Sequence, residues 1–599
     1  MTGGFRQSTS WVHTWAGLLL GSLLYFIFLT GTAGYFDSEI DRWMRPELPP
    51  PPAPVDSARA ADAALRYLNA HEAGAERWAI QLPGHRDTPH LVASWPHDGH
   101  MEEQALDADS GEPLATPRET GGGQLLYRMH WRLHYLPAGA ALWLVGAATV
   151  FLLVSLVSGV VAHKRFFADF FTFRAGKGQR SWLDAHNVLG VMTLPFQFMI
   201  TYSGLIFFAV TLMPWVVSAH YGAGPAGQGQ FLAEFTAWQA PAAPSGTPAP
   251  LAPVAPMLAQ AEQRWGLGSV QAVEVLHPGD ASARVQIAPV LTGPLRNVEV
   301  MVFDGASGAL LETRAPSRRG TLTVAEGLLG LHEGLFAGPV LRWLYALSGL
   351  LGTAMVATGL VLWTVKRRQK LERDQGRPHR GLRLVERLNV RNRVRPARGH
   401  RRLLLGQPPA ADRPGRPRRL GGARPLHRLG RHAAARLPAA TTARLGGARR
   451  ARRRGAGPVA GVERAHRRAA PRCVLGAGRL GDGGIRSHRA GAGERLRVDR
   501  LAPAPAGAAN GGRRVMPLLA LALACVGFAG LALAMDRHHQ RLCKRPASRA
   551  ARWLGRAVGL LGLGAALAVC LLGAGGAVGP VLWLGLLSVA GVVVVLALA

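Results

Sequence analysis

Four long stretches without acidic or basic residues constrain this chain more than any other feature of its sequence. They cover residues 7–36, 133–163, 185–217 and 343–365. A helix of about 20 apolar residues crosses the hydrocarbon core of a bilayer, so each stretch is long enough to span a membrane. The first is too long for the apolar region of a secretory signal peptide, which has about 7–15 residues. We therefore expect four spans, at residues 8–36, 130–163, 185–217 and 332–365.

The charge of the connecting segments orients these spans. Residues 164–184 and the sequence VKRRQK from Val365 are basic, which favours the cytoplasmic side. Residues 37–128 and 218–330 then lie on the opposite side. Both alternate apolar and polar residues in the manner of β-strands, and structureless connections of about 90 residues are uncommon. We expect each segment to form a small α+β domain.

The spans are related by an internal duplication. His13, Gly17 and Gly31 in the first span have the same spacing as His186, Gly190 and Gly204 in the third. The second and fourth spans share a second set of matches, which pairs His130, Leu133 and Pro137 with His332, Leu335 and Pro339. Both copies begin on the same side of the membrane. The pattern therefore predicts an all-α transmembrane bundle of two parallel repeats, related by an axis along the membrane normal.

The two outer segments also match each other. Each contains the sequence D-x-x-S-G, at Asp107 and at Asp304. Such a sequence favours a hairpin turn in which the glycine takes a positive φ angle. The repeated unit is therefore helix, outer domain, helix.

Two pairs of histidines are equivalent under the repeat, His13 with His186 and His130 with His332. A haem on the repeat axis needs one ligand from each copy, and imidazole is a usual axial ligand of haem iron. Ionisable side chains inside a membrane are costly and are generally functional. A single histidine at a helix end is more often an interfacial residue or a cap, but two matched pairs favour haem ligation.

Two further histidines are alternative ligands. His134 lies one helical turn after His130, and His163 corresponds to Trp363 in the other repeat. Either could replace one member of a symmetric pair, so both stay among the candidates for binding haem iron.

The sequence offers few other groups for electron transfer. All four cysteines lie beyond residue 390, so the first 390 residues contain neither a disulfide nor a thiolate-held iron–sulfur cluster. No glycine-rich dinucleotide motif or P-loop is present.

The excess of basic residues belongs to one segment. Residues 391–514 carry a net charge of +27 out of the +34 of the whole chain, and contain no Lys and no aromatic residue. We therefore expect no nucleic-acid partner. The segment is either a disordered basic linker or the product of a frameshift that joins two neighbouring genes. The topology favours a frameshift. If residues 391–514 stayed in the cytoplasm, the next span would run outward and the basic hairpin 536–556 would lie outside, against the positive-inside rule. We expect a separate three-helix membrane module at residues 516–599.

The H-x-x-x-G openings at His13 and His186, the D-x-x-S-G turns and the VKRR sequence after the fourth span resemble the PepSY-associated transmembrane family. This family includes iron-regulated membrane proteins and ferric-siderophore reductases of the Gram-negative inner membrane. The resemblance covers residues 8–390. It implies two PepSY-like periplasmic domains, two b-type haems, and an oxidoreductase that reduces a ferric siderophore with electrons from a cytoplasmic or quinol donor.

Two other functions are compatible with the same sequence. A non-enzymatic membrane regulator could use PepSY-like domains to bind or inhibit a peptidase. A transporter would suit the parallel repeat, but the spans lack acidic residues and broken helices. Residues 516–599 resemble a small uncharacterised membrane protein found beside siderophore-uptake genes, and this resemblance implies no activity.

Overall fold

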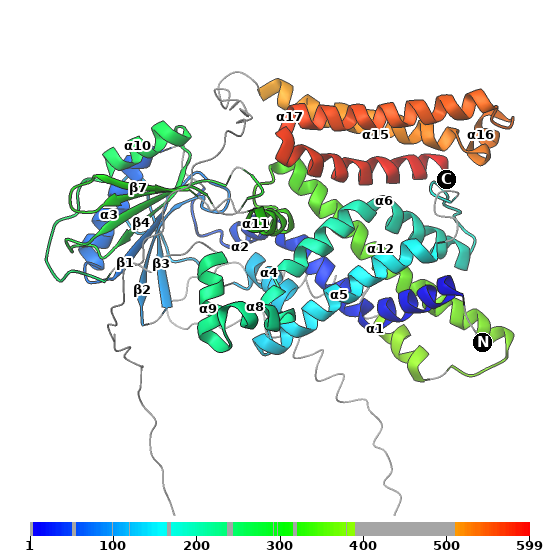
Figure 1. The fold of residues 1–599 in the computed structure, drawn as a ribbon, viewed down its shortest axis with the longest axis horizontal. Coiled ribbons are helices and arrows are strands. Elements are labelled where there is room, and N and C mark those ends of the chain that lie inside the picture. Colours follow the sequence, from blue (N-terminus) through cyan, green and yellow to red (C-terminus); the bar gives the residue numbers. More distant parts are fainter. Residues whose placement is uncertain are drawn as a thin grey trace, which may run out of the picture. The chain divides into compact units, whose positions relative to one another are not determined.

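The computed structural model describes residues 510–599 and residues 4–389, the latter apart from residues 51–54, 99, 119, 164–168, 236–242, 292, 296–297, 316–319 and 379. The two interpretations of residues 391–514 concern a segment that lies almost entirely outside the described residues. The described chain is mostly helical and contains one antiparallel sheet (Figure 1).

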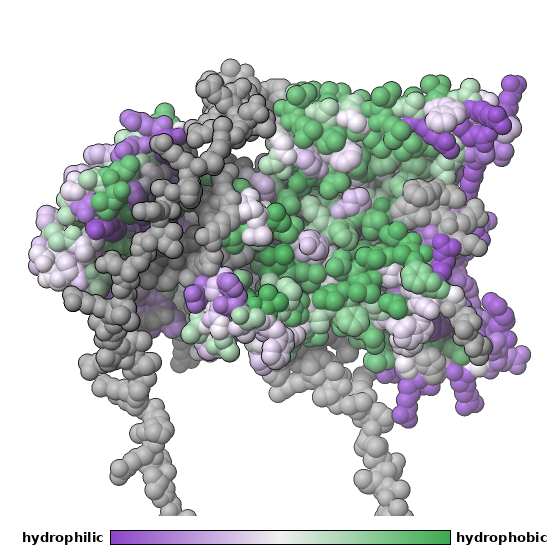
Figure 2. All heavy atoms as spheres, viewed as in Figure 1, coloured by the Kyte–Doolittle hydropathy of each residue, from purple (hydrophilic) through white to green (hydrophobic). Residues whose placement is uncertain are grey.

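Six helices in the described ranges are long and apolar enough to cross a membrane. Four follow the expected spans, namely α1 (Phe5–Gly34), α5 (Ala138–Ala162), α6 (Gln179–Ile206) and α12 (Pro339–Arg373). The other two are α15 (Asn510–Leu533) and α17 (Arg549–Leu598). Apolar side chains cover these helices, as a bilayer requires (Figure 2). The chain is therefore a multi-pass membrane protein.

The second and fourth spans begin later than expected. His130 lies in a separate helix, α4 (Gly122–Arg132), which ends where Leu133 adopts a left-handed conformation with φ of 46°. Helix α5 then starts after Pro137. In the second repeat, His332 lies in α11 (Gly320–Glu333), and α12 starts at Pro339. Proline suits the start of a helix, because the N–H that it lacks would have no carbonyl partner within the helix there.

The third span ends at Ile206 and not at residue 217. Three shorter helices follow it, α7 (Ala209–Leu212), α8 (Pro214–Tyr221) and α9 (Gly224–Phe235). Pro214 begins α8, which agrees with the preference of proline for the first turn of a helix.

The outer segments form one sheet, where two separate domains were expected. The strands are β1 (Arg77–Gln81), β2 (Leu91–His97), β3 (His100–Leu106), β4 (Val270–Leu276), β5 (Arg284–Pro289), β6 (Val300–Asp304) and β7 (Leu310–Arg314). Their order is β3-β2-β1-β4-β5-β6-β7, so the two segments join where β1 pairs with β4. The alternation of apolar and polar residues predicted strands in both segments. It does not specify which strand of one segment pairs with which strand of the other.

Two helices, one from each segment, complete the sheet domain. Helices α3 (Ser57–His71) and α10 (Ala255–Trp265) share one core of buried residues with the strands. Leu68 and Met257 are buried there beside Ile80 and Ile287. Because one core receives side chains from both copies, neither segment completes its own hydrophobic layer.

The two D-x-x-S-G turns have the predicted geometry. Asp107 Oδ1 accepts hydrogen bonds from the N–H and hydroxyl of Ser110, and Asp304 Oδ1 accepts the same two from Ser307. These bonds lower the pKa values of both carboxyl groups. Gly111 and Gly308 take φ angles of 80° and 76°, which confirms the prediction of positive φ.

The C-terminal region contains α15, the short α16 (Asp536–Cys543) and α17. Helix α17 is interrupted at Gly575, whose φ is 74°, and Pro580 follows five residues later. Helix α17 therefore has two stretches, one on each side of a kink. The expected three-helix module at residues 516–599 stays a prediction. Gly591 of α17 lies against Met192 of α6.

The shared sheet can be tested by a disulfide across its central pair. Ala79 of β1 is directly opposite Glu274 of β4. We expect Ala79→Cys with Glu274→Cys to form a disulfide, detected by mass spectrometry of the digested protein, because opposed strand residues have suitable Cβ separation. The control pairs Ala79→Cys with Glu312→Cys on β7, about 19 Å away across four strand spacings. Equal linkage of both pairs, or no linkage of the first, would contradict the shared sheet.

Candidate functional site

The structure brings the four histidines of the repeat together as two pairs. The ring centres of His13 and His186 are 6.1 Å apart, with their planes inclined at 60°. Those of His130 and His332 are 6.0 Å apart and inclined at 25°. In each pair one ring comes from each repeat, as the sequence predicted.

Each ring is held by a hydrogen bond from its Nδ1 to a backbone carbonyl of its own repeat. His13 bonds Ser155 O at 2.8 Å, and His186 bonds Met355 O at 2.9 Å. The other two bonds join His130 to Ile27 O at 2.9 Å and His332 to Ile200 O at 2.8 Å.

These carbonyls correspond under the duplication. Ile27 follows His13 by the same number of residues as Ile200 follows His186. A carbonyl only accepts, so Nδ1 must carry the proton and Nε2 keeps its lone pair. All four rings are thus held in the tautomer that can bind a metal through Nε2.

A glycine of a neighbouring helix faces each ring. A methyl group built on Gly159 would lie 3.0 Å from His13 Cε1, and one on Gly359 would lie 2.9 Å from His186 Cε1. For the outer pair, the corresponding contacts are 2.5 Å from Gly31 to His130 Nδ1 and 2.7 Å from Gly204 to His332 Cε1. Real Cβ atoms do not approach so closely, so each ring position depends on the absence of a side chain.

The spacing of the rings fits an iron between them. An imidazole nitrogen binds a transition metal at about 2 Å and lies roughly 1.1 Å from its ring centre, so two rings that bind one metal from opposite sides have centres about 6.2 Å apart. A direct hydrogen bond between two imidazoles would bring the centres to about 5 Å. Among the described residues, none of the four Nε2 atoms has a recorded hydrogen-bond partner. The observed 6.0 and 6.1 Å therefore fit bis-histidine haem better than a direct contact.

The sites lie near opposite ends of the spans. Gly31, which faces His130, follows His13 by 18 residues in the same helix, a rise of about 27 Å. The two pairs are thus separated by most of the thickness of a hydrocarbon core. In the part of the chain that the structure describes, no group of three or more His, Cys, Asp or Glu side chains could hold a metal ion.

Each of the two alternative histidines lies next to the end of a helix. His134 follows the left-handed Leu133, and its ring packs edge-on against Tyr135 at 4.6 Å. His163 caps the end of α5, where its backbone N–H bonds Gly159 O. Its repeat counterpart, Trp363, lies under the Arg367 guanidinium at 3.8 Å from the ring centre. The repeat is not symmetric at this position.

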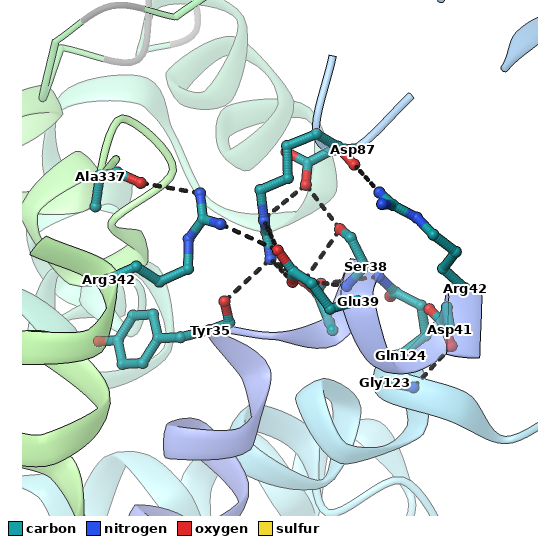
Figure 3. Close-up of polar contacts among 12 residues, drawn as sticks. Tyr35, Ser38, Glu39, Asp41, Arg42, Asp87, Gly123, Gln124, Ala337 and Arg342 are labelled. Carbon is teal, nitrogen blue, oxygen red and sulfur yellow. Dashed lines mark hydrogen bonds and ion pairs between the residues drawn. The ribbon is translucent and has the colours of Figure 1, made fainter. Parts of the chain in front are cut away.

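A cluster of charged residues joins the loop between β1 and β2 to the first residues of α2 (Asp37–Met44) and to α12 (Figure 3). Arg86, in the β1–β2 loop, donates to both carboxylate oxygens of Glu39 on α2, at 2.9 and 2.7 Å. Arg86 also contacts Asp37 and Asp87. Arg342, near the start of α12, reaches the same Glu39 at 3.1 Å. Glu39 therefore links the outer segment of one repeat to a span of the other.

Two tyrosines extend this cluster to His332. Arg86 donates to Tyr35 O, and the Tyr35 hydroxyl donates to His332 O at 3.1 Å. The Tyr345 ring packs edge-on against Tyr35, and its hydroxyl bonds Leu331 O. The sequence analysis did not identify these residues. Arg342, a charged residue near the start of a span, was a signal, but its partner could not be deduced from spacing.

Burial opposes the ionisation of Glu39, but its hydrogen bonds with Arg86 and the charges of Arg86 and Arg342 outweigh burial and lower its pKa. A carboxyl group with a lowered pKa in the folded state stabilises that state above its ordinary pKa. This stabilisation is lost as the pH falls through the lowered value.

Comparison with known families assigns most of the chain. A family model described as the PepSY-associated TM region matches residues 10–366. A second model, described as a protein of unknown function (DUF3325), matches residues 518–599. No curated protein matches the chain.

Removal of the Arg86 guanidinium tests the charged cluster. We expect Arg86→Gln to lower the stability of the sheet domain at pH 7 by about 1–3 kcal/mol, since it leaves Glu39 without its main partner. The loss of stability between pH 7 and pH 4 should be smaller in the variant than in the wild type. Thermal unfolding followed by circular dichroism at both pH values measures this difference.

The matched control is Arg77→Gln, which removes an exposed ion pair with Glu274 on the same sheet. We expect little change from it, because exposed ion pairs contribute about 0–1 kcal/mol. An equal loss of stability between pH 7 and pH 4 in the wild type and in Arg86→Gln would show that Arg86 does not lower the pKa of Glu39.

Proposed function

The chain belongs to the PepSY-associated transmembrane family, and we propose that its two histidine pairs hold two b-type haems that carry electrons across the membrane to a ferric siderophore. The observation that carries this proposal is the spacing of the rings, 6.1 and 6.0 Å between centres, with each Nδ1 bonded to a carbonyl. His13 and His186 would hold one haem, and His130 and His332 the other. Bound haem iron supplies one-electron chemistry.

The protein's own residues determine where that chemistry occurs. The backbone bonds orient the rings, and the glycines keep the ring positions open. The apolar spans exclude bulk water from the region between the sites. The two centres are separated by a rise of about 27 Å along α1, which would put one near each face of a hydrocarbon core about 30 Å thick.

The direction of transfer follows from charge. The end of α12 carries Lys366, Arg367 and Arg368, and the positive-inside rule favours the cytoplasmic side of a bacterial membrane for this end. The His13/His186 site is then near the cytoplasmic face, where a cytoplasmic or quinol donor would deliver electrons. The sheet and the His130/His332 site face the periplasm, so the protein would be an inner-membrane reductase.

The reaction needs only one electron for each iron. Fe(III) held by a siderophore accepts one electron, and the products are Fe(II) and the iron-free siderophore. Siderophores bind Fe(III) through hard oxygen donors, and Fe(II) is less charged and softer, so these ligands hold it weakly. Neither a nucleophile nor a proton-transfer residue is required. The choice of a siderophore as acceptor rests on the family.

Haem content tests the ligands. We expect the dithionite-reduced protein to show b-type absorption bands. His186→Ala and His332→Ala should each remove about half of the haem, as each deletes one ligand of one site. Gly204→Ala should resemble His332→Ala, because its methyl group would lie 2.7 Å from the His332 ring.

The matched control for that glycine is Gly139→Ala, since a methyl group at Gly139 meets nothing within 4 Å. Wild-type protein without a Soret band after purification from haem-replete cells would refute haem binding. Full haem in the Gly204→Ala protein would refute the assigned ring position.

The acceptor is tested separately. We expect reduced protein in detergent to be reoxidised by a ferric hydroxamate siderophore, with release of Fe(II) that ferrozine traps. The control is the His332→Ala protein, in which reoxidation should slow at least tenfold because the centre nearest the acceptor is lost. Haem that other oxidants reoxidise, but that stays reduced with a panel of ferric siderophores, would exclude this substrate class and leave electron transfer intact.

A further inference from the structure

Three polar side chains lie together inside the bundle between the histidine pairs. Gln197 and Thr201 are one helical turn apart on α6, and Ser348 is on α12. Their exposed fractions are 0%, 3% and 0%. Gln197 Nε2 donates to Ser348 O at 2.8 Å, which brings the two helices together at this level.

Each of the three side chains has a polar atom without a partner among the described residues. These atoms are Gln197 Oε1, Thr201 Oγ1 and Ser348 Oγ. Buried hydroxyls elsewhere in the spans bond the carbonyl one turn earlier, as Thr193 bonds Leu189 O and Thr353 bonds Gly349 O. Thr201 and Ser348 do not, so their hydroxyl groups are available to another molecule.

The first repeat has no such cluster. The residues that correspond to Gln197, Thr201 and Ser348 are Leu24, Phe28 and Ala148. Leu24 and Ala148 are buried in an apolar core. The polar groups are therefore a feature of one repeat, and the fold does not require them at these positions.

Unsatisfied polar groups in a membrane interior cost several kcal/mol each, because no bulk water reaches them. The three groups are chemically complementary to one small ligand. Gln197 Oε1 can only accept a hydrogen bond, while the hydroxyls of Thr201 and Ser348 can donate. A water molecule donates and accepts, and buried waters commonly have two to four polar partners.

We infer that α6 and α12 bind a structural water molecule, which donates to Gln197 Oε1 and accepts from the hydroxyls of Thr201 and Ser348. The Gln197 carboxamide packs directly on the backbone of α12 at Gly352. A methyl group on Gly352 would lie 2.7 Å from Nε2 and 2.9 Å from Oε1, so a side chain there would displace the carboxamide. The site lies within one helical turn of Ile200, whose carbonyl holds His332. It makes the environment polar on the His332 side of the outer pair and leaves the His130 side apolar.

Isosteric variants of the full-length protein in detergent distinguish a hydrated site from bare hydroxyls. Thr201→Val removes an unpartnered hydroxyl, and the matched control Thr353→Val removes one that already bonds its own helix. If water is bound, Thr201→Val should lower the unfolding midpoint by about 2–4 °C more than the control. If no water is bound, removal of a buried, unsatisfied hydroxyl should leave the midpoint unchanged or raise it.

A second variant tests whether the hydroxyls share one ligand. Ser348→Ala installs the residue of the first repeat, so we expect it to fold. Its effect should be less than additive with that of Thr201→Val, because either change alone disrupts the same water. A high-resolution cryo-EM map should show density between Gln197, Thr201 and Ser348, and this density should vanish in the double variant. Additive effects, or a wild-type map without that density, would overturn the inference. None of these readouts depends on haem or on a siderophore.

Discussion

The hydrogen bond from each histidine Nδ1 to a backbone carbonyl is the contact on which both histidine pairs depend. All four bonds stay within one repeat. His13 and His130 bond Ser155 and Ile27 of the first copy, while the second copy holds its own two rings. The rings meet their partners only across the axis. Each repeat therefore orients its ligands independently, and the pairs form when the two copies pack together.

This division explains the choice of backbone groups as the anchors. A carbonyl in a helix is already placed by the helical bonds around it, and it changes neither its charge nor its rotamer. A carboxylate in the same place would add a buried charge to a site inside a membrane. The glycine beside each ring acts in a similar way. Its backbone is fixed and it has no side chain, so the imidazole fits against it in one position.

Much of this arrangement could be predicted from the sequence, and the limits have physical causes. Charge-free length identified the four spans, because the bilayer imposes it directly. Matched spacing identified the pairs His13/His186 and His130/His332, since residues that meet on an axis must recur in both copies. The breaks at Leu133 and Pro137 were missed because the apolar pattern runs through them without interruption.

Contacts between the repeats were harder to predict. The pairing of β1 with β4 and the bonds from Glu39 to Arg86 and Arg342 join segments far apart in sequence. Nothing in the alternation of a strand specifies its neighbour, and a single glutamate near a span has many possible partners. These contacts arise from packing of the whole chain, which no local pattern records.

The duplication also separates two kinds of residue within one sequence. Residues that meet their own counterparts on the axis are bound to recur, as the four histidines do. Other residues are free to differ. Arg342 corresponds to Leu142, Trp363 to His163, and Gln197 to Leu24. At Arg342 and Gln197 the second repeat makes a polar or charged contact, where the first has an apolar leucine. The second repeat thus carries the link to the sheet through Glu39 and the buried polar cluster, while the first keeps an apolar interior at the matching positions. A symmetric pair of rings consequently lies in an asymmetric environment, and the two members of the outer pair need not be equivalent in their chemistry.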